Sequence, residues 1–204
     1  MARLIKAAGP VMLRDTLDDS FAALVRSIMY QQLAGAAAAT IHGRFLKLFA
    51  DGLSPAAVLT LPEGAMRSAG LSGSKAAAVA DLALKVGDGT VPLDDVDSQS
   101  DDDLVARLVQ VRGIGRWTAE MFLMFQLQRL DVWPVDDYGV RKGWSLAHKL
   151  NEPLTPRALE PEGDRFRPYR SIAAWYCWRA VDTVLAAVPP RRTSTSNRRS
   201  SAEE

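Results

Sequence analysis

Residues 108–137 contain two features whose residue types and spacing are suited to chemistry, a pair of glycines and a pair of aspartates. Gly113 and Gly115 lie between two segments whose apolar residues recur at helical spacing. Glycine accepts positive φ and has no Cβ, so the backbone of such a hairpin can approach a phosphate closely. The unpaired N–H groups at the start of the second helix also favour an anion. Asp136 and Asp137 follow an apolar run further on. The stretch therefore predicts an anion-binding hairpin close to a reactive carboxylate.

Length and composition indicate a globular protein. The chain has 204 residues, of which 48% are hydrophobic, enough for one large or two small domains with a buried core. No apolar run approaches the roughly 18 residues of a membrane span, and the start of the chain lacks a secretory signal pattern. Cys177 is the single cysteine, so it can form neither an internal disulfide nor an iron–sulfur cluster on its own. We expect a cytoplasmic protein without a membrane partner.

The charge distribution is more informative than the net charge of +1. Residues 88–103 contain seven aspartates and no basic residue, which is typical of a solvated connection. The basic residues in and after the hairpin are Arg107, Arg112, Arg116, Arg129, Arg141 and Lys142. A local basic surface can bind a nucleic acid backbone although the whole molecule is nearly neutral.

The hydrophobic periodicity predicts an all-α fold, because apolar residues recur at helical spacing and alternating strand patterns are absent. We expect a helix that is capped by Asp18, Asp19 or Ser20 and ends near residues 30–35. Further helices are expected over residues 36–49, about 76–86, 138–150 and 171–188, with one helix capped by Ser100 before the hairpin, one from Trp117 after it, and short helical turns at Pro55 and Pro62. Residues 151–168 are predicted to be a proline-broken connector. The folded domain would cover residues 1–188, with the hairpin at about 100–129. Residues 189–204 have no apolar content to bury, so we predict a disordered tail.

The hairpin together with the sequence WPVDDYGVRKG resembles the helix-hairpin-helix superfamily of DNA glycosylases. Within that superfamily, LVQVRGIGRWTAEMFLMF is most similar to the DNA-3-methyladenine glycosylase II branch. The similarity runs from about Asp19 to Trp178 and so covers most of the chain. It implies a two-lobed helical bundle with double-stranded DNA bound at the cleft between the lobes. The N-terminal β-rich domain that this branch often carries is not expected here.

Asp137 matches the catalytic aspartate of that family, because Tyr138, Gly139 and Val140 begin the helix that normally follows it. Asp136 is the alternative if the match is displaced by one residue. A carboxylate in a water-poor cleft would stabilise an oxocarbenium-like sugar while the N-glycosidic bond breaks, and it could also orient a water. Aspartate is also a favoured helix N-cap. The two roles are compatible.

Trp117 occupies the place where the resemblance puts a Schiff-base lysine in bifunctional members, and residues 113–130 contain no lysine. We therefore expect a monofunctional glycosylase that leaves an abasic site intact. Trp117 would instead line the base pocket, where an indole face attracts a cationic alkylated base by roughly 0.5–2 kcal/mol. The resemblance also places Trp178 near the aspartate, and Tyr30 is a further candidate wall. The alternative for each aromatic residue is ordinary core packing.

Two further segments are predicted to contact DNA. By resemblance, Gln32 takes the wedge position that enters the duplex when a base is flipped out. Other members of the branch have an apolar residue there, so Leu33 is the alternative wedge, and a polar helix end is the structural alternative. Lys75 begins a helix that resembles a phosphate-contacting helix of the family. The hairpin contacts would come from Gly113, Gly115, Arg116 and Thr118, against the alternative of a purely structural turn.

No cofactor or catalytic metal is expected, because His42 and His148 are isolated from other potential ligands in the sequence. The resemblance does imply a possible structural monovalent cation at the hairpin. Its ligands would be the backbone carbonyls of Val109, Val111 and Ile114.

The predicted activity is excision of alkylated bases such as 3-methyladenine from double-stranded DNA, within base excision repair, by a monomer associated with the nucleoid. One alternative is a glycosylase for another lesion, a deaminated or oxidised purine. A second alternative is a non-catalytic DNA-binding module that uses the hairpin alone. Asp137 and its aromatic neighbours separate the enzyme from the module, because simple binding would not require them.

Overall fold

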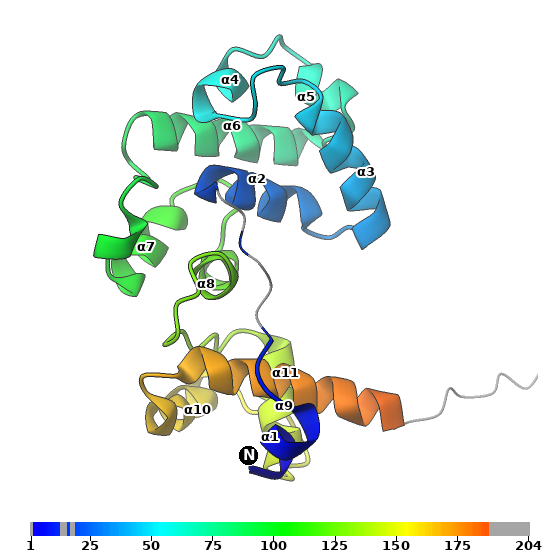
Figure 1. Ribbon diagram of the computed structural model, residues 1–204, viewed down its shortest axis with the longest axis vertical. Helices are drawn as coiled ribbons and strands as arrows, with labels where there is room; N and C mark the ends of the chain where they lie inside the picture. Colours follow the sequence, from blue (N-terminus) through cyan, green and yellow to red (C-terminus); the bar gives the residue numbers. More distant parts are fainter. Residues whose placement is uncertain (1, 13–15, 17–18, 188–204) are drawn as a thin grey trace, which may run out of the picture.

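The computed structural model describes residues 2–12, 16 and 19–187, and these contain helices joined by loops and turns, with no strand among them. The all-α prediction is therefore confirmed. Figure 1 shows two lobes, one above the other, with helix α8 (Arg116–Phe125) lying where they face each other. None of the helices in the described part is long and apolar enough to cross a membrane. The predicted tail, residues 189–204, lies outside the described residues.

The upper lobe contains most of the helices. They are α2 (Ser20–Tyr30), α3 (Gly35–Leu46), α4 (Pro55–Leu59), α5 (Ala65–Ser68), α6 (Gly73–Gly87), the 3-10 helix η1 (Val96–Ser98), α7 (Asp101–Leu108) and α8 (Arg116–Phe125). The Asp19 carboxylate caps α2 by accepting hydrogen bonds from the backbone N–H groups of Phe21 and Ala22. Ser72 and Ser100 cap α6 and α7 in the same way. Helix α6 begins three residues earlier than expected, because the Ser72 cap sets its first turn.

The lower lobe contains both ends of the described chain. Its elements are α1 (Ala2–Ala8), α9 (Tyr138–Ala147), α10 (Pro156–Leu159), the 3-10 helix η2 (Glu160–Phe166) and α11 (Arg170–Ala187). The predicted connector over 151–168 is thus wrong in part, since it contains α10 and η2. Thr155 caps α10, and a proline at the first turn starts each short helix instead of preventing it.

Helices α9 and α11 cross at very short range. A Cβ added at Gly143 would lie 1.8 Å from the carbonyl oxygen of Cys177, so only glycine fits at the crossing. The Tyr176 hydroxyl donates to the Gly9 carbonyl at 2.9 Å and fastens the N-terminal segment to α11. The close packing of α9 against α11 fixes the position of the first residues of α9.

The segment 126–137 carries the chain from α8 into the lower lobe, and side-chain hydrogen bonds fix its course. The Ser171 hydroxyl donates to the Arg129 carbonyl at 2.6 Å and accepts from the Val132 N–H at 2.9 Å. The buried indole N–H of Trp133 donates to the Leu159 carbonyl at 3.1 Å. The start of α9 is therefore held in place relative to α8, although the two helices belong to different lobes.

Candidate active site

Asp137 is the residue immediately before α9, and three donors hold its half-buried carboxylate. Oδ1 accepts from the Val140 backbone N–H at 2.8 Å, which is the helix cap, and from the Trp178 indole N–H at 2.9 Å. Oδ2 accepts from the Trp117 indole N–H at 2.7 Å. The structure thus brings together Asp137, Trp117 and Trp178. The capping alternative considered for Asp137 is real, and it coexists with the two indole contacts.

The two indoles reach the carboxylate from opposite lobes. Trp117 lies in the first turn of α8 and is 47% exposed. Trp178 comes from α11 and stacks on Phe125, with ring centroids 5.6 Å apart. The carboxylate therefore lies at the junction of the lobes, beside an indole surface that is open to a planar ligand. Phe125 was not among the predicted site residues, since its spacing is that of an ordinary core position.

Gly139 makes the approach of Trp178 to Asp137 possible. A Cβ at this position would lie 2.7 Å from Trp178 Cδ1 and 3.0 Å from Asp137 Oδ1. The sequence contains a signal for this requirement, because Gly139 and Gly143 are four residues apart and share one face of α9. That spacing indicates a close helix contact, but not which aromatic side chain comes near.

Tyr30 lies at the end of α2 and makes its ring contacts inside the upper lobe. Its ring meets the His42 ring edge-on at a centroid distance of 6.0 Å, and the Arg26 guanidinium lies 4.6 Å from its centroid. These contacts do not connect Tyr30 with the carboxylate, and its role as a pocket wall stays a prediction.

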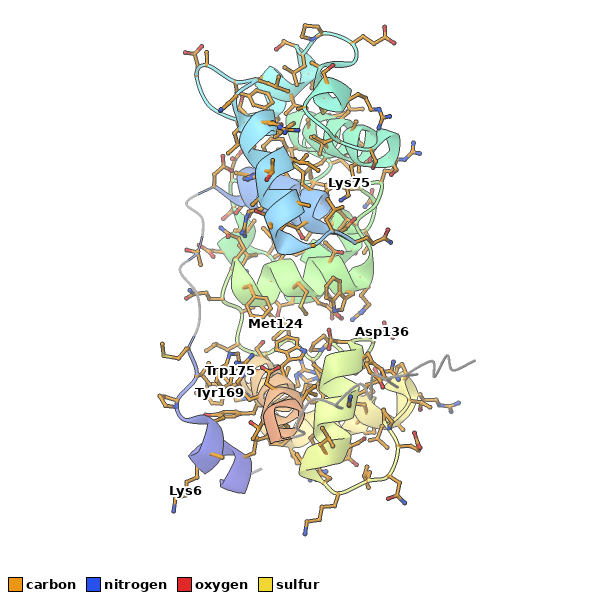
Figure 2. The ribbon with its side chains drawn as sticks, turned by 90° about the vertical axis from the view of Figure 1, so that its right-hand side faces the viewer. Lys6, Lys75, Met124, Asp136, Tyr169 and Trp175 are labelled. Carbon is orange, nitrogen blue, oxygen red and sulfur yellow. The ribbon has the colours of Figure 1, made fainter. Side chains whose placement is uncertain are left out.

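Asp136, the alternative to Asp137, has an exposed side chain. Figure 2 shows it on the side of the molecule away from Lys6, the same side as Lys75.

The hairpin has the geometry expected for an anion-binding turn. Gly113 has φ +78°, and Gly113 and Gly115 are both exposed. Gly115 is the N-cap of α8 and provides no side-chain cap, so the first N–H groups of α8 lack that partner. Ile114 is buried and anchors the turn from inside. The exposed glycine backbone next to open helix N–H groups can receive a phosphate.

The two side chains that follow the hairpin differ in their orientation. Arg116 is well exposed, and its Nε donates to Glu120 Oε1 at 2.9 Å. Thr118 is only 6% exposed, and its hydroxyl oxygen is 3.4 Å from the Gln31 amide nitrogen that donates to it. The predicted DNA contact of Thr118 is therefore left to its backbone N–H, because the side chain faces the protein interior.

Glu120 is a buried carboxylate that sequence reasoning missed. It is 3% exposed, and its Oε2 has no hydrogen-bond partner. Burial raises the pKa of Glu120, and the neighbouring Arg116 opposes that shift. It lines a polar cavity of about 540 Å³ between the lobes, together with Arg116, Asp131 and Arg170. The only sequence signal was the i, i+4 spacing of Arg116 and Glu120 on α8.

The predicted wedge loop follows α2 and is exposed at Gln32 and Leu33. Gln32 has φ +56°, the left-handed conformation that is uncommon outside glycine. Lys75 points inward, and its ammonium group donates to the carbonyls of Met29 and Gln31, both at 2.7 Å. Lys75 was predicted to contact a DNA phosphate, and in the structure its ammonium group binds these two backbone carbonyls. The phosphate contact itself stays a prediction.

The described residues contain no group of three or more His, Cys, Asp or Glu side chains that could hold a metal ion. The carbonyls proposed for a monovalent cation are those of Val109, Val111 and Ile114. The Val111 carbonyl accepts the Ile114 N–H at 3.0 Å, as part of the hairpin turn. Cation binding at these carbonyls stays a prediction.

Comparison with known proteins identifies the family to which the chain belongs. The chain belongs to the HhH-GPD superfamily of base excision DNA repair proteins, whose family model matches residues 25–168. It is 32% identical over 194 residues to DNA-3-methyladenine glycosylase 1 of Schizosaccharomyces pombe. The matched region covers 93% of this chain and 85% of that protein.

Two solved structures are similar over most of their length. DNA-3-methyladenine glycosidase of Bacillus halodurans superposes with a TM-score of 0.84 at 33% identity, covering 91% of this chain and 85% of that one. The 3-methyladenine DNA glycosylase of S. pombe in complex with abasic DNA superposes with a TM-score of 0.75 at 32% identity, covering 87% and 89%. These similarities support the two-lobed glycosylase fold predicted from the hairpin.

Proposed function

We propose that this protein is a monofunctional DNA glycosylase that releases alkylated bases of the 3-methyladenine type from double-stranded DNA. The observation that carries the proposal is the Asp137 carboxylate held between Trp117 of one lobe and Trp178 of the other. The relatives described above are named for the same activity. A module that only bound DNA would have no use for a carboxylate oriented by two indoles at the lobe junction.

DNA binding would begin at the hairpin, where phosphate contacts position the protein without reading sequence. The damaged nucleotide must then leave the stack, which requires a few kcal/mol for an intact duplex and less for a damaged base. Gln32 or Leu33, exposed at the end of α2, would fill the space that the base leaves. The flipped base would lie against the exposed face of Trp117, where a positively charged purine gains a cation–π contact.

The chemical step is cleavage of the bond between the sugar C1′ and the base nitrogen. The base departs with the bonding electron pair, which neutralises the positive charge of an alkylated purine. The sugar becomes oxocarbenium-like, and the Asp137 carboxylate stabilises that developing charge. Water then adds to C1′ and loses its proton to solvent or to Asp137. The two indole N–H groups keep the carboxylate oriented throughout, so little reorganisation is required.

Trp117 cannot form a Schiff base, so the product would be an unbroken strand that contains an abasic site. We also propose that the protein acts as a monomer. The proposed reaction involves no cofactor, and the monovalent cation at the hairpin carbonyls would be structural. We also propose that the protein works in the cytoplasm, on nucleoid DNA.

The decisive experiment compares Asp137→Asn with Asp136→Asn in glycosylase assays on duplexes that each carry one defined lesion. Asparagine keeps the cap of α9 but removes the negative charge. We expect release of 3-methyladenine to fall by about 100-fold or more in Asp137→Asn, with affinity for abasic DNA changed only a few-fold. Asp136→Asn should behave like the wild type. Unchanged release in Asp137→Asn would refute the assignment.

The same duplexes separate the alternatives. Preferential release of deaminated or oxidised purines would point to the other lesion classes, and DNA binding without release of any base would point to the non-catalytic module. Borohydride trapping should yield no covalent enzyme–DNA complex. Assays must be run at one controlled salt concentration, because phosphate contacts make affinity depend on salt.

A further inference from the structure

The exposed loop after α2 has a backbone conformation that needs support. Gln32 lies at its tip with φ +56°, in the left-handed region that side chains other than glycine rarely occupy. The loop contains the Leu33 N–H to Tyr30 carbonyl hydrogen bond, which is long at 3.4 Å. The local turn therefore contributes little to holding Gln32 in place, and the support comes from elsewhere.

One support is Lys75, in the first turn of α6. Its ammonium group donates to the carbonyls of Met29 and Gln31 at 2.7 Å each. The last carbonyls of a helix lack intrahelical partners and favour a cation, so Lys75 caps the C-terminus of α2 from outside. Burial lowers the pKa of Lys75, consistent with an ammonium group that is packed against neutral carbonyls. Lys75, Gln32 and Leu33 also line one hollow of about 260 Å³.

The second support is the Gln31 side chain. Its amide nitrogen donates to the Gly113 carbonyl at 3.0 Å and to the Thr118 hydroxyl at 3.4 Å. The amide therefore spans from the loop to both sides of the glycine hairpin. Lys75 binds the Gln31 carbonyl while the Gln31 amide binds the hairpin, so one residue is held at its backbone and at its side chain.

We propose that Lys75 and Gln31 are positioning residues for base flipping, and that they fix Gln32 relative to the hairpin before DNA arrives. The proposal rests on the proposed function, since it assigns a role in the same reaction. In the proposed function the hairpin binds a phosphate while Gln32, or Leu33 beside it, enters the base stack. Both contacts can form at once only if the distance between the loop and the hairpin is fixed. A loop that had to order itself on the DNA would lose conformational entropy at that step.

A positioning role differs measurably from a direct phosphate contact. A lysine that binds a phosphate releases a counterion on binding, so its removal lowers the slope of log K against log salt by about 0.9. A lysine that only braces the loop leaves this slope unchanged. Lys75→Met and Gln31→Met remove the donors while retaining much of the side-chain volume. Lys47→Met is the matched control, since Lys47 is an exposed lysine at the end of α3.

The experiment titrates each variant against a duplex with an abasic-site analogue and an adjacent 2-aminopurine, whose fluorescence reports disturbance of the stack. We expect Lys75→Met and Gln31→Met to reduce the fluorescence change at saturation several-fold, with the salt slope of the wild type. The double variant should lose less than the product of the single losses, because both residues hold the same loop. Lys47→Met should match the wild type, and thermal melting verifies that each variant is folded.

Two results would overturn the proposal. One is a lower salt slope in Lys75→Met with a full fluorescence change, which would make Lys75 a phosphate contact. The other is a wild-type fluorescence change in folded Lys75→Met and Gln31→Met. The abasic analogue contains no base to release, so the measurement does not depend on glycosylase activity. If the wild type released no base while the two variants still showed the reduced fluorescence change, the proposed function would be disproved and the positioning role would remain.

Discussion

Asp137 combines a structural and a chemical role at the residue scale. Its Oδ1 caps α9 and binds the Trp178 indole, while Oδ2 has the Trp117 indole as its hydrogen-bond partner. A carboxylate oxygen can accept more than one hydrogen bond, so Oδ2 keeps the capacity to face a reacting sugar or a water. The cap keeps the carboxylate from rotating, and this explains why a helix N-terminus is a suitable place for it.

The Gly139→Ala variant tests this orientation. The added Cβ would lie 2.7 Å from Trp178 Cδ1, so the indole must move by some tenths of an ångström and its bond to Asp137 weakens. We expect kcat for base release to fall by about 10- to 100-fold, since small misplacements of reacting groups have effects of that size. Affinity for abasic DNA should change little, and single-turnover kinetics separate the two quantities.

Gly43→Ala is the matched control, because a Cβ at Gly43 in α3 meets nothing within 4 Å. It should leave kcat unchanged and stabilise the fold slightly, as expected for alanine in a helix. Equal kcat in Gly139→Ala and the wild type would show that the Trp178 contact has no part in orienting Asp137.

At the scale of elements, α8 has a different function on each of its faces. Its N-terminus carries the hairpin, Trp117 faces the carboxylate, and Glu120 turns into the polar cavity between the lobes. Figure 2 shows Met124, also on α8, near the lower lobe that carries Trp175. One amphipathic helix therefore joins the glycine hairpin to the carboxylate of Asp137.

The buried Glu120 on α8 predicts a pH dependence of stability. Burial raises its pKa in the folded protein above the ordinary value of 4.5. The folded state therefore holds this proton more tightly, and Glu120 lowers stability as pH rises above about 4.5. Glu120→Gln should gain stability relative to the wild type as pH rises above 4.5, and the gain should level off once Glu120 is ionised in the folded state. Urea unfolding across that range measures the difference, and a difference independent of pH would contradict the burial argument.

At the scale of the whole molecule, the two lobes depend on the segment between α8 and α9. Asp131 lies in this segment and accepts hydrogen bonds from Arg167 at 2.9 Å and from Arg170 at 2.8 Å. Together with the Ser171 contacts, these hydrogen bonds hold the segment between α8 and α9 against the start of α11. The distance between Trp117 and Trp178, and so the geometry around Asp137, depends on this connection.

Asp131→Asn tests the connection. Burial alone would raise the pKa of Asp131, but the hydrogen bonds and charges of Arg170 and Arg167 lower it below 3.8. Its contribution to stability is then fully present above the unfolded pKa and is lost as pH falls through the folded one. We expect Asp131→Asn to lower the free energy of unfolding by about 1–3 kcal/mol at pH 7. The difference from the wild type should shrink in acid, as urea unfolding can show.

Asp182→Asn is the control for this variant. Asp182 is exposed on α11 and pairs with Arg179 at 2.7 Å, and such surface pairs contribute only about 0–1 kcal/mol. If both variants lost the same small amount of stability, the Asp131 cluster would be an ordinary surface ion pair instead of a connection between the lobes.

The sequence alone determined the local features of this protein. Apolar periodicity identified the main helices, serine and aspartate marked their caps, and the glycine hairpin and Asp137 were recognised from short motifs. The predicted helices and caps are present in the structure because a cap or a buried stripe depends on residues a few positions apart. The same periodicity missed α10 and η2, where short turns starting at prolines leave no stripe long enough to detect.

The tertiary structure alone decided which of these features meet. Lys75 and Thr118 turned out to face inward toward Gln31, and Trp178 came to lie on Asp137 where Gly139 leaves room for it. Each of these contacts joins residues far apart in the chain, so it depends on how helices cross and how closely their backbones approach. Helix spacing in a sequence defines the face on which a side chain lies. Only packing between the helices determines what that face touches.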